Sequence, residues 1–241
     1  MSALLFINGV SKRFRGLVAV DRASCEVIKG EIFAVIGPNG AGKTTLFNII
    51  AGALKPDEGT IAFQGERIDG LRPDEICRRG IARTFQIVRP FPALTVEDNV
   101  MIGALLRTSD AARARAKVQD VMRQLDLFDK RTRIAKSLTL PDRKRLEVAR
   151  ALATDPKLLL LDEVMAGLRP TETDHMVQIL KEINRDTGLT ILLIEHVMRA
   201  VNALASRVLV LNHGAAIATG GPADVVRDPA VVQSYLGAEV V

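Results

Sequence analysis

The sequence lacks any long apolar run. No segment of its 241 residues approaches the roughly 20 consecutive apolar residues that a helix needs to span a bilayer. The first residues, MSALLFINGVSKRF, also lack the charged start and long apolar core of a signal peptide, and they alternate like a strand instead. We therefore expect a chain that is made and kept in the cytosol.

Cysteine is nearly absent. Cys25 and Cys77 are the only two and lie far apart in sequence, so in a cytosolic chain we expect both to be reduced thiols. The three histidines, His175, His196 and His213, show no ligand spacing with them. A cysteine–histidine metal site is therefore not expected.

The basic residues form no long block either. The net charge of +5 is mild and only weakly favours anionic partners such as nucleotides or lipid headgroups. Without an arginine–lysine block or interleaved aromatic residues, nothing indicates a nucleic-acid partner. What is abundant is apolar side chain: 48% of the residues are hydrophobic, enough for a substantial core in one large domain or two modest lobes.

Strands and helices alternate along most of the chain. The runs EIFAVIG and KLLLLDE are almost wholly apolar, as expected for strands buried on both faces. A helix is predicted from Lys43 to about Ala51, ending at Gly52, and GTIAFQGERI is predicted to form a hairpin centred on Gln64-Gly65. This alternation predicts an α/β fold with a mostly parallel sheet and helices on both faces.

The middle of the chain is helical in pattern. Thr95 with Asp98 resembles a capping box ahead of VEDNVMIGALL, and further helices are expected in SDAARARAKVQDVMRQLDLF and PDRKRLEVARALAT. Thr139, with Pro141 in the first turn, is expected to cap the last of these. We expect a single domain over residues 1–241, with an α/β core and β subdomain in 1–87 and 154–241 and an inserted helical lobe in 88–153.

The stretch GPNGAGKTT fits the pattern G-x-x-x-x-G-K-[ST] between a predicted strand and a predicted helix. Its glycines let main-chain amides curl around phosphate oxygens, and the helix N-terminus adds partial positive charge. Lys43 is placed to reach the β- and γ-phosphates, and the Thr44 hydroxyl to hold Mg²⁺. The stretch predicts a nucleoside triphosphate site whose binding residues are Gly37, Pro38, Asn39, Gly40, Ala41, Gly42, Lys43, Thr44 and Thr45.

Two acidic residues end the apolar run LLLLDE. Asp162 is placed to bind the magnesium, directly or through water, and Glu163 to polarise an attacking water as a general base. Acidic residues that merely end a strand are common. The phosphate loop upstream favours the catalytic interpretation.

With GPNGAGKTT, LLLLDE and the histidine of TILLIEH in this order, the chain resembles the ATPase subunits of ABC transporters over nearly its whole length. A finer resemblance, to the ATP-binding subunits of branched-chain amino-acid importers, lies in GIARTFQIVRPFPALTVEDNV, RLEVARALATDPKLLLLDEVMAGL, IEHVM and GGPADVVRDPAVVQSYLG. Close relatives serve other small solutes, including amides, urea and aromatic-acid derivatives. The resemblance implies a P-loop NTPase core, an N-terminal antiparallel β subdomain and Mg²⁺-dependent ATP hydrolysis.

The resemblance also assigns roles to single positions. Phe14 corresponds to the aromatic residue that stacks on adenine, although a lone phenylalanine in an early strand is more often a core residue. Gln86 corresponds to the glutamine that contacts the metal or the attacking water, and His196 to the histidine that contacts the γ-phosphate. His175 and His213 match nothing functional and are expected at the surface or in packing. The implied catalytic set is Lys43, Gln86, Glu163 and His196, and the implied metal set is Thr44, Gln86 and Asp162.

Partners follow from the same resemblance. In this family two subunits face each other head to tail and sandwich two ATP molecules, each between one subunit's phosphate loop and the other's signature motif, L-S-G-G-Q. Permease subunits would dock near Ile87–Asn99, where RPFPALT offers an exposed Phe91, unless this stretch is only an inter-lobe connection. A periplasmic or extracellular binding protein would act indirectly, and the chain would lie peripherally on the inner face of the cell membrane.

The signature positions here read LTLPD, Leu138–Asp142. Thr139 keeps a hydroxyl for the opposite ATP, but Pro141 has no N–H to offer. Asp142 brings negative charge near a polyanion, and at about 5 Å the repulsion between unit charges is roughly 3 kcal/mol at an effective dielectric constant near 20. The adjacent basic residues, Arg143, Lys144 and Arg145, would offset part of it.

A second departure lies at the expected dimer interface, where Arg169 occupies a position that the family usually gives to Asp or Asn. Both departures face the partner's ATP. We therefore expect an asymmetric heterodimer in which the LTLPD site turns over slowly. A tolerated subgroup variant of the signature and a homodimer stay open as alternatives.

Other classes of ATPase need weighing against this interpretation. An ATPase of a related exporter, for example one that extracts lipid, shares the fold and is the main alternative. A soluble ABC ATPase would usually carry a coiled-coil insertion or a second cassette, and a small P-loop kinase would not combine Gln86, RLEVARAL and His196. The transported solute stays open, because specificity lies in the membrane and binding-protein subunits.

Overall fold

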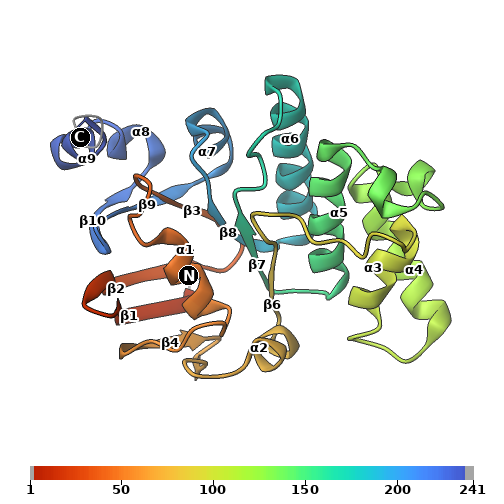
Figure 1. The fold of residues 1–241 in the computed structure, drawn as a ribbon, viewed down its shortest axis with the longest axis horizontal. Helices are drawn as coiled ribbons and strands as arrows, with labels where there is room; N and C mark the ends of the chain where they lie inside the picture. The colour runs from red at the N-terminus through yellow and green to blue at the C-terminus, as the bar shows by residue number, and fades with distance from the viewer. Residues whose placement is uncertain (1–2, 237–241) are drawn as a thin grey trace.

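The computed structural model describes residues 3–236 and contains two sheets (Figure 1). An antiparallel sheet has the strand order β2-β1-β4-β5, and a central sheet has the order β10-β9-β3-β8-β7-β6. In the central sheet β9, β3, β8, β7 and β6 run parallel, and β10 is antiparallel to β9. The strands are β1 (Ala3–Phe14), β2 (Leu17–Ile28), β3 (Ile32–Ile36), β4 (Glu58–Phe63), β5 (Glu66–Arg67), β6 (Ile81–Arg83), β7 (Leu158–Asp162), β8 (Thr190–Ile194), β9 (Arg207–Asn212) and β10 (Ala215–Gly220).

The helices are distributed unevenly around the sheets. Helix α1 lies between the two sheets, and α3, α4 and α5 form a group at the end of the molecule far from the antiparallel sheet (Figure 1). The α-helices are α1 (Lys43–Ile50), α2 (Pro73–Arg79), α3 (Val96–Ala104), α4 (Ala111–Gln124), α5 (Leu140–Ala153), α6 (Pro170–Thr187), α7 (Met198–Leu204), α8 (Pro222–Val225) and α9 (Pro229–Leu236). Two short 3₁₀ helices, η1 (Phe128–Lys130) and η2 (Ala135–Ser137), precede α5. Within residues 3–236 no helix is long and apolar enough to cross a membrane.

The central sheet is buried on both faces, and β7 shows how the sequence achieves this. Leu158 and Leu160 point into the core shared with α1 and the antiparallel sheet. Leu159 and Leu161 point into a second core, which continues without a break into α3, α4 and α5. Because successive strand residues point to opposite faces, a strand with helices on both sides must be apolar throughout.

The predicted fold class is confirmed, together with its local signals. Strands β4 and β5 pair as the predicted hairpin, and both turn residues, Gln64 and Gly65, have positive φ. Helix α1 ends at Ile50, just before Gly52 in the left-handed region. The hydroxyl of Thr95 accepts a hydrogen bond from the Asp98 amide at the start of α3, which confirms the predicted cap. The Asp98 carboxylate accepts from the Thr95 hydroxyl and not from the Thr95 amide, so the reciprocal half of the capping box does not form. The division into residues 1–87, 88–153 and 154–241 stays a prediction.

Candidate nucleotide site

The predicted phosphate loop connects the end of β3 to the start of α1, at the carboxyl end of a central parallel strand. Gly37 and Gly42 both have positive φ, and a side chain at either would collide with a main-chain carbonyl, of Leu211 and Ala19 respectively. Only glycine therefore fits these two positions. The Lys43 ammonium is buried and donates to the carbonyls of Gly37 (2.7 Å) and Pro38 (2.9 Å), so it lies inside the loop.

Asp162 ends β7, the second strand from β3 in the central sheet, and is almost fully buried. Its Oδ2 accepts a hydrogen bond from Arg83 (2.8 Å), whose other guanidinium nitrogen binds Asn48 of α1 (2.6 Å). Its Oδ1 is buried and has no hydrogen-bond partner among residues 3–236. One carboxylate oxygen is thus fixed by an arginine, and the other is left for a ligand.

Glu163, Gln86 and His196 come together beside this aspartate. The Gln86 amide donates to Glu163 Oε2 (2.7 Å), and His196 Nδ1 lies 3.9 Å from the same oxygen. Burial lowers the pKa of Lys43, while the nearby carboxylates of Glu163 and Asp162 raise it in part. Residues predicted from three separate stretches of sequence therefore form one polar cluster next to the phosphate loop.

Phe14 lies at the end of β1 with 42% of its surface exposed. The core interpretation of this residue is therefore wrong. The Lys12 ammonium lies 5.8 Å from the centre of its ring.

A sequence model described as ABC transporter matches residues 20–166, more than half of the chain. The chain belongs to this family of ATP-binding cassettes. A second model, described as branched-chain amino acid ATP-binding cassette transporter, matches residues 217–241 of the cassette, part of which lies outside the described residues.

Relatives of the cassette match it from end to end. The high-affinity branched-chain amino acid transport ATP-binding protein LivG of Escherichia coli is 39% identical, over 97% of this chain and 98% of LivG. BraF of Pseudomonas aeruginosa is 35% identical over the same shares. Among solved structures, an ATP-binding cassette of an ABC transporter in its ADP conformation superposes with a TM-score of 0.88 at 32% identity, covering 98% of this chain and all of that one.

The cassette's signature region, Leu138–Asp142, differs from expectation in two respects. Thr139 occupies the cap position of α5, but its side chain makes no capping hydrogen bond to the helix. The Thr139 hydroxyl instead helps to lower the pKa of the Asp142 carboxyl. Asp142 does not present a free charge: its side chain is buried and accepts hydrogen bonds from Lys130 (2.6 Å) and Arg145. The predicted repulsion between Asp142 and a neighbouring polyanion is therefore largely neutralised within the chain.

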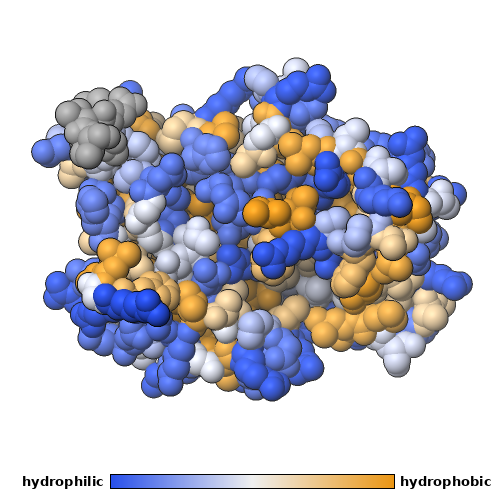
Figure 2. Space-filling model, viewed as in Figure 1, coloured by the Kyte–Doolittle hydropathy of each residue, from blue (hydrophilic) through white to orange (hydrophobic). Residues whose placement is uncertain are grey.

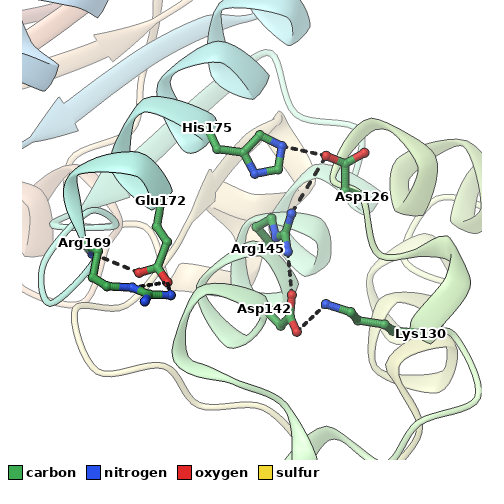
Figure 3. A network of polar contacts seen from close by, with 7 residues as sticks. All are labelled: Asp126, Lys130, Asp142, Arg145, Arg169, Glu172 and His175. Atoms are coloured by element: carbon green, nitrogen blue, oxygen red, sulfur yellow. Dashed lines mark hydrogen bonds and ion pairs between the residues drawn. The ribbon is translucent and has the colours of Figure 1, made fainter.

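Figure 3 shows this network extending from α5 to α6. Arg145 reaches from Asp142 toward Asp126 (3.8 Å), which also binds His175 of α6 (2.8 Å). His175 thus joins the lobe to α6 at the surface, as expected of a residue outside the nucleotide site. His213 is exposed at the turn between β9 and β10, which agrees with the same expectation.

Arg169 sits at the start of α6, where its main chain and side chain both bind Glu172 (2.9 Å and 2.6 Å). This pairing forms a capping box, and 81% of the arginine side chain stays exposed. Arg169, the residue that departs from the family pattern here, therefore caps its own helix, and its guanidinium is exposed.

Three side chains organise the site through contacts that were not predicted from the sequence. Arg83 binds Asp162, Lys130 binds Asp142, and Lys144 donates to the main-chain carbonyls of Gln86 (3.1 Å) and Glu163 (3.0 Å). Of the three adjacent basic residues expected to offset Asp142, Arg145 does so and Lys144 does not. No spacing rule links these pairs, because each joins elements that meet only in the folded chain.

Proposed function

We propose that this cassette hydrolyses ATP with Mg²⁺ and so powers the import of small solutes, foremost branched-chain amino acids. The convergence of Gln86, Glu163 and His196 beside the phosphate loop carries this proposal. The loop amides and Lys43 bind the triphosphate, and Phe14 stacks on the adenine. Glu163 then accepts a proton from the attacking water as the bond between the γ-phosphorus and the bridging oxygen breaks and ADP departs. His196 contacts the γ-phosphate and Gln86 orients the water.

The residues present fit a magnesium ion. Asp162 keeps one buried oxygen without a hydrogen-bond partner in the described chain, and Thr44 directly follows Lys43 in the loop. Carboxylate and hydroxyl oxygens are the ligands that this hard cation prefers. Bound there with Gln86 as a further ligand, it would neutralise charge on the β- and γ-phosphates.

The solute class rests on the named relatives. LivG and BraF are described as branched-chain amino acid transport proteins, and the C-terminal model carries the same description. The methionine import ATP-binding protein MetN of Histophilus somni is also 35% identical, over 94% of this chain and 67% of MetN, so identity across the cassette does not by itself separate solutes. The C-terminal match favours branched-chain amino acids over methionine.

A groove beside the Gln86 segment supports permease docking. The cavity measures about 410 Å³. Its apolar lining includes Ile76 of α2, Phe85, Ile102 of α3 and Leu106 just after α3. Figure 2 shows apolar surface over α3 and over the loop that joins β6 to α3. The dock that we propose therefore covers residues 87–99 together with this groove, and it holds the cassette on the inner face of the membrane. An external binding protein would deliver solute to the permeases.

A second cassette completes each nucleotide site in our proposal. The phosphate loop of this chain would face the partner's signature motif, and Leu138–Asp142 with the Thr139 hydroxyl would face the partner's ATP. Since Asp142 is neutralised internally, slow turnover at the LTLPD site now rests on the missing N–H of Pro141 and the bulk of Leu140. This favours a heterodimer, in which the partner supplies an intact signature.

The solute proposal is tested with the assembled transporter in vesicles. The complex contains this cassette, its partner cassette, the permeases and the binding protein. We expect leucine, isoleucine or valine to stimulate ATP hydrolysis and to accumulate in an ATP-dependent manner, and methionine or urea to do neither. A matched complex with Lys43→Ala should show no uptake. Stimulation by lipid substrates with no amino-acid uptake would contradict import.

A further inference from the structure

Lys144 is a buried cation that the proposed chemistry does not use. It lies on α5, two residues after the signature region, with only 4% of its surface exposed. Its ammonium donates to two main-chain carbonyls, of Gln86 (3.1 Å) and of Glu163 (3.0 Å). A charge is buried only where hydrogen bonds compensate its loss of water, so these two carbonyls account for its position.

The backbone of Glu163 needs such a restraint. Its φ is +49°, in the left-handed region that residues with large side chains rarely adopt. The Glu163 amide donates to the Ile194 carbonyl (3.0 Å), and Lys144 binds the Glu163 carbonyl at the other side of the same residue. Because φ and ψ fix the direction of the Cα–Cβ bond, these contacts also aim the carboxylate.

The second carbonyl that Lys144 binds belongs to Gln86, whose side chain is itself hydrogen-bonded to the Glu163 carboxylate. The Gln86 side chain donates to Glu163 Oε2 (2.7 Å), and the Gln86 carbonyl is held by the same ammonium that holds Glu163. Six residues further along α5, Arg150 donates to the carbonyl of Arg89 (2.6 Å) in the same loop as Gln86. Helix α5 thus holds the main chain of both residues that form the Gln86–Glu163 contact.

A buried carboxylate lies near the ammonium. Glu195 is 1% exposed and accepts a hydrogen bond from the Met165 amide (2.9 Å), which holds the loop that follows Glu163. Burial lowers the pKa of Lys144, and Glu195 is the charged neighbour that opposes this most strongly. The ammonium donates to the main-chain carbonyl of Glu163 and not to its carboxylate, which leaves the carboxylate to face Gln86.

We infer that Lys144 is a positioning residue, which orients the Glu163 carboxylate and the Gln86 amide from the main-chain side. This inference rests on the proposed role of Glu163 as the base. It predicts that loss of the ammonium slows the chemical step while nucleotide binding, which involves other residues, persists.

The test uses the complete transporter with Lys144→Met, Lys144→Arg and Lys144→Gln. We expect Lys144→Met to lower kcat between about tenfold and a hundredfold, as small misplacements of catalytic groups do, with KM changed less than about threefold. Lys144→Arg should restore most of the rate. Lys181→Met, at an exposed lysine of α6, serves as the matched control and should leave kcat unchanged.

A double-variant comparison separates positioning from general structural damage. If Lys144 acts through Glu163, adding Lys144→Met to Glu163→Gln should lower the residual rate no further. Additive losses, or an unchanged kcat in Lys144→Met, would overturn the inference. Should Lys144→Met not fold, Lys144→Arg must still exceed Lys144→Gln in kcat, and equal rates would overturn it too. A normal rate in Glu163→Gln alone would instead refute the proposed role of Glu163.

Discussion

The charge that a single residue of this cassette presents depends on its hydrogen-bond partners, as Asp142 shows. Asp142 is acidic and lies next to a predicted phosphate site, so its sequence position predicts repulsion between its carboxylate and the phosphates. In the folded chain its carboxylate is enclosed by Lys130 and Arg145. Burial raises the pKa of Asp142, but the hydrogen bonds from Lys130, Arg145 and Thr139 outweigh it, so the pKa lies below its ordinary value of 3.8.

This environment makes Asp142 a stabilising charge. A carboxylate with a lowered pKa contributes stability above its unfolded value of 3.8, and the contribution is lost as the pH falls through the folded pKa. We expect Asp142→Asn to reduce the free energy of unfolding by about 1.5–3 kcal/mol at neutral pH, with the difference shrinking at pH below 3.8. Urea unfolding of the isolated cassette measures this.

Asp120→Asn is a suitable control for that measurement, because Asp120 pairs with Arg123 on the exposed face of α4. Its loss should stay below about 1 kcal/mol. A loss from Asp142→Asn that is the same at every pH would show that the substitution acts through packing and not through charge.

At the scale of elements, the link from β6 to α3 carries both Gln86, for which we propose a catalytic role, and the proposed docking surface. Gln86 binds Glu163 at one end of this link. Further along, the Arg150 guanidinium lies 5.0 Å from the centre of the Phe91 ring, which keeps this exposed ring in place. A permease bound to this surface would therefore contact the segment that carries Gln86, the hydrogen-bond partner of the proposed base Glu163.

A substitution in the apolar groove tests directly whether the permeases dock there. Ile102 of α3 is 44% exposed, and placing an acidic side chain there should oppose burial against a permease. We expect Ile102→Asp to weaken assembly with the permeases by more than about tenfold while ATP affinity is unchanged. Pull-down of the permeases, with fluorescent nucleotide titration of the free cassette, measures both.

Val232→Asp on α9 is the matched control, since Val232 is similarly exposed (41%) and lies far along the chain from the groove. It should leave assembly intact. Equal weakening by the two variants would argue against docking at α3.

The elements that sequence analysis predicted well are those with strong local signals. Apolar runs such as that of β7 indicate a strand buried on both faces, and the glycines of the phosphate loop require their conformation wherever the loop occurs. Helix α2 and strand β6, with seven and three residues, were not predicted because they are too short to show a period. The Arg83–Asp162 pair joins residues 79 apart and depends on the sheet order, which no local pattern contains.

At the scale of the whole molecule, the nucleotide site and the signature region are parts of one packed structure. The core that lines one face of the central sheet continues into the lobe helices, and α5 carries both the signature region at its start and Lys144 one turn later. A displacement of α5 with its neighbouring helices would therefore shift Gln86 and Glu163. We expect this connection to couple permease movement to hydrolysis.

The central claim is that the site on this chain's own phosphate loop is the one that turns over ATP. The most direct measurement is the ATPase rate of the reconstituted transporter carrying Glu163→Gln, compared with the equivalent glutamate substitution in the partner cassette. We predict a loss of at least about a hundredfold for Glu163→Gln, the contribution expected of a general base, and a clearly smaller loss for the partner. Equal losses would contradict the asymmetry, and an unchanged rate in Glu163→Gln would contradict the site itself.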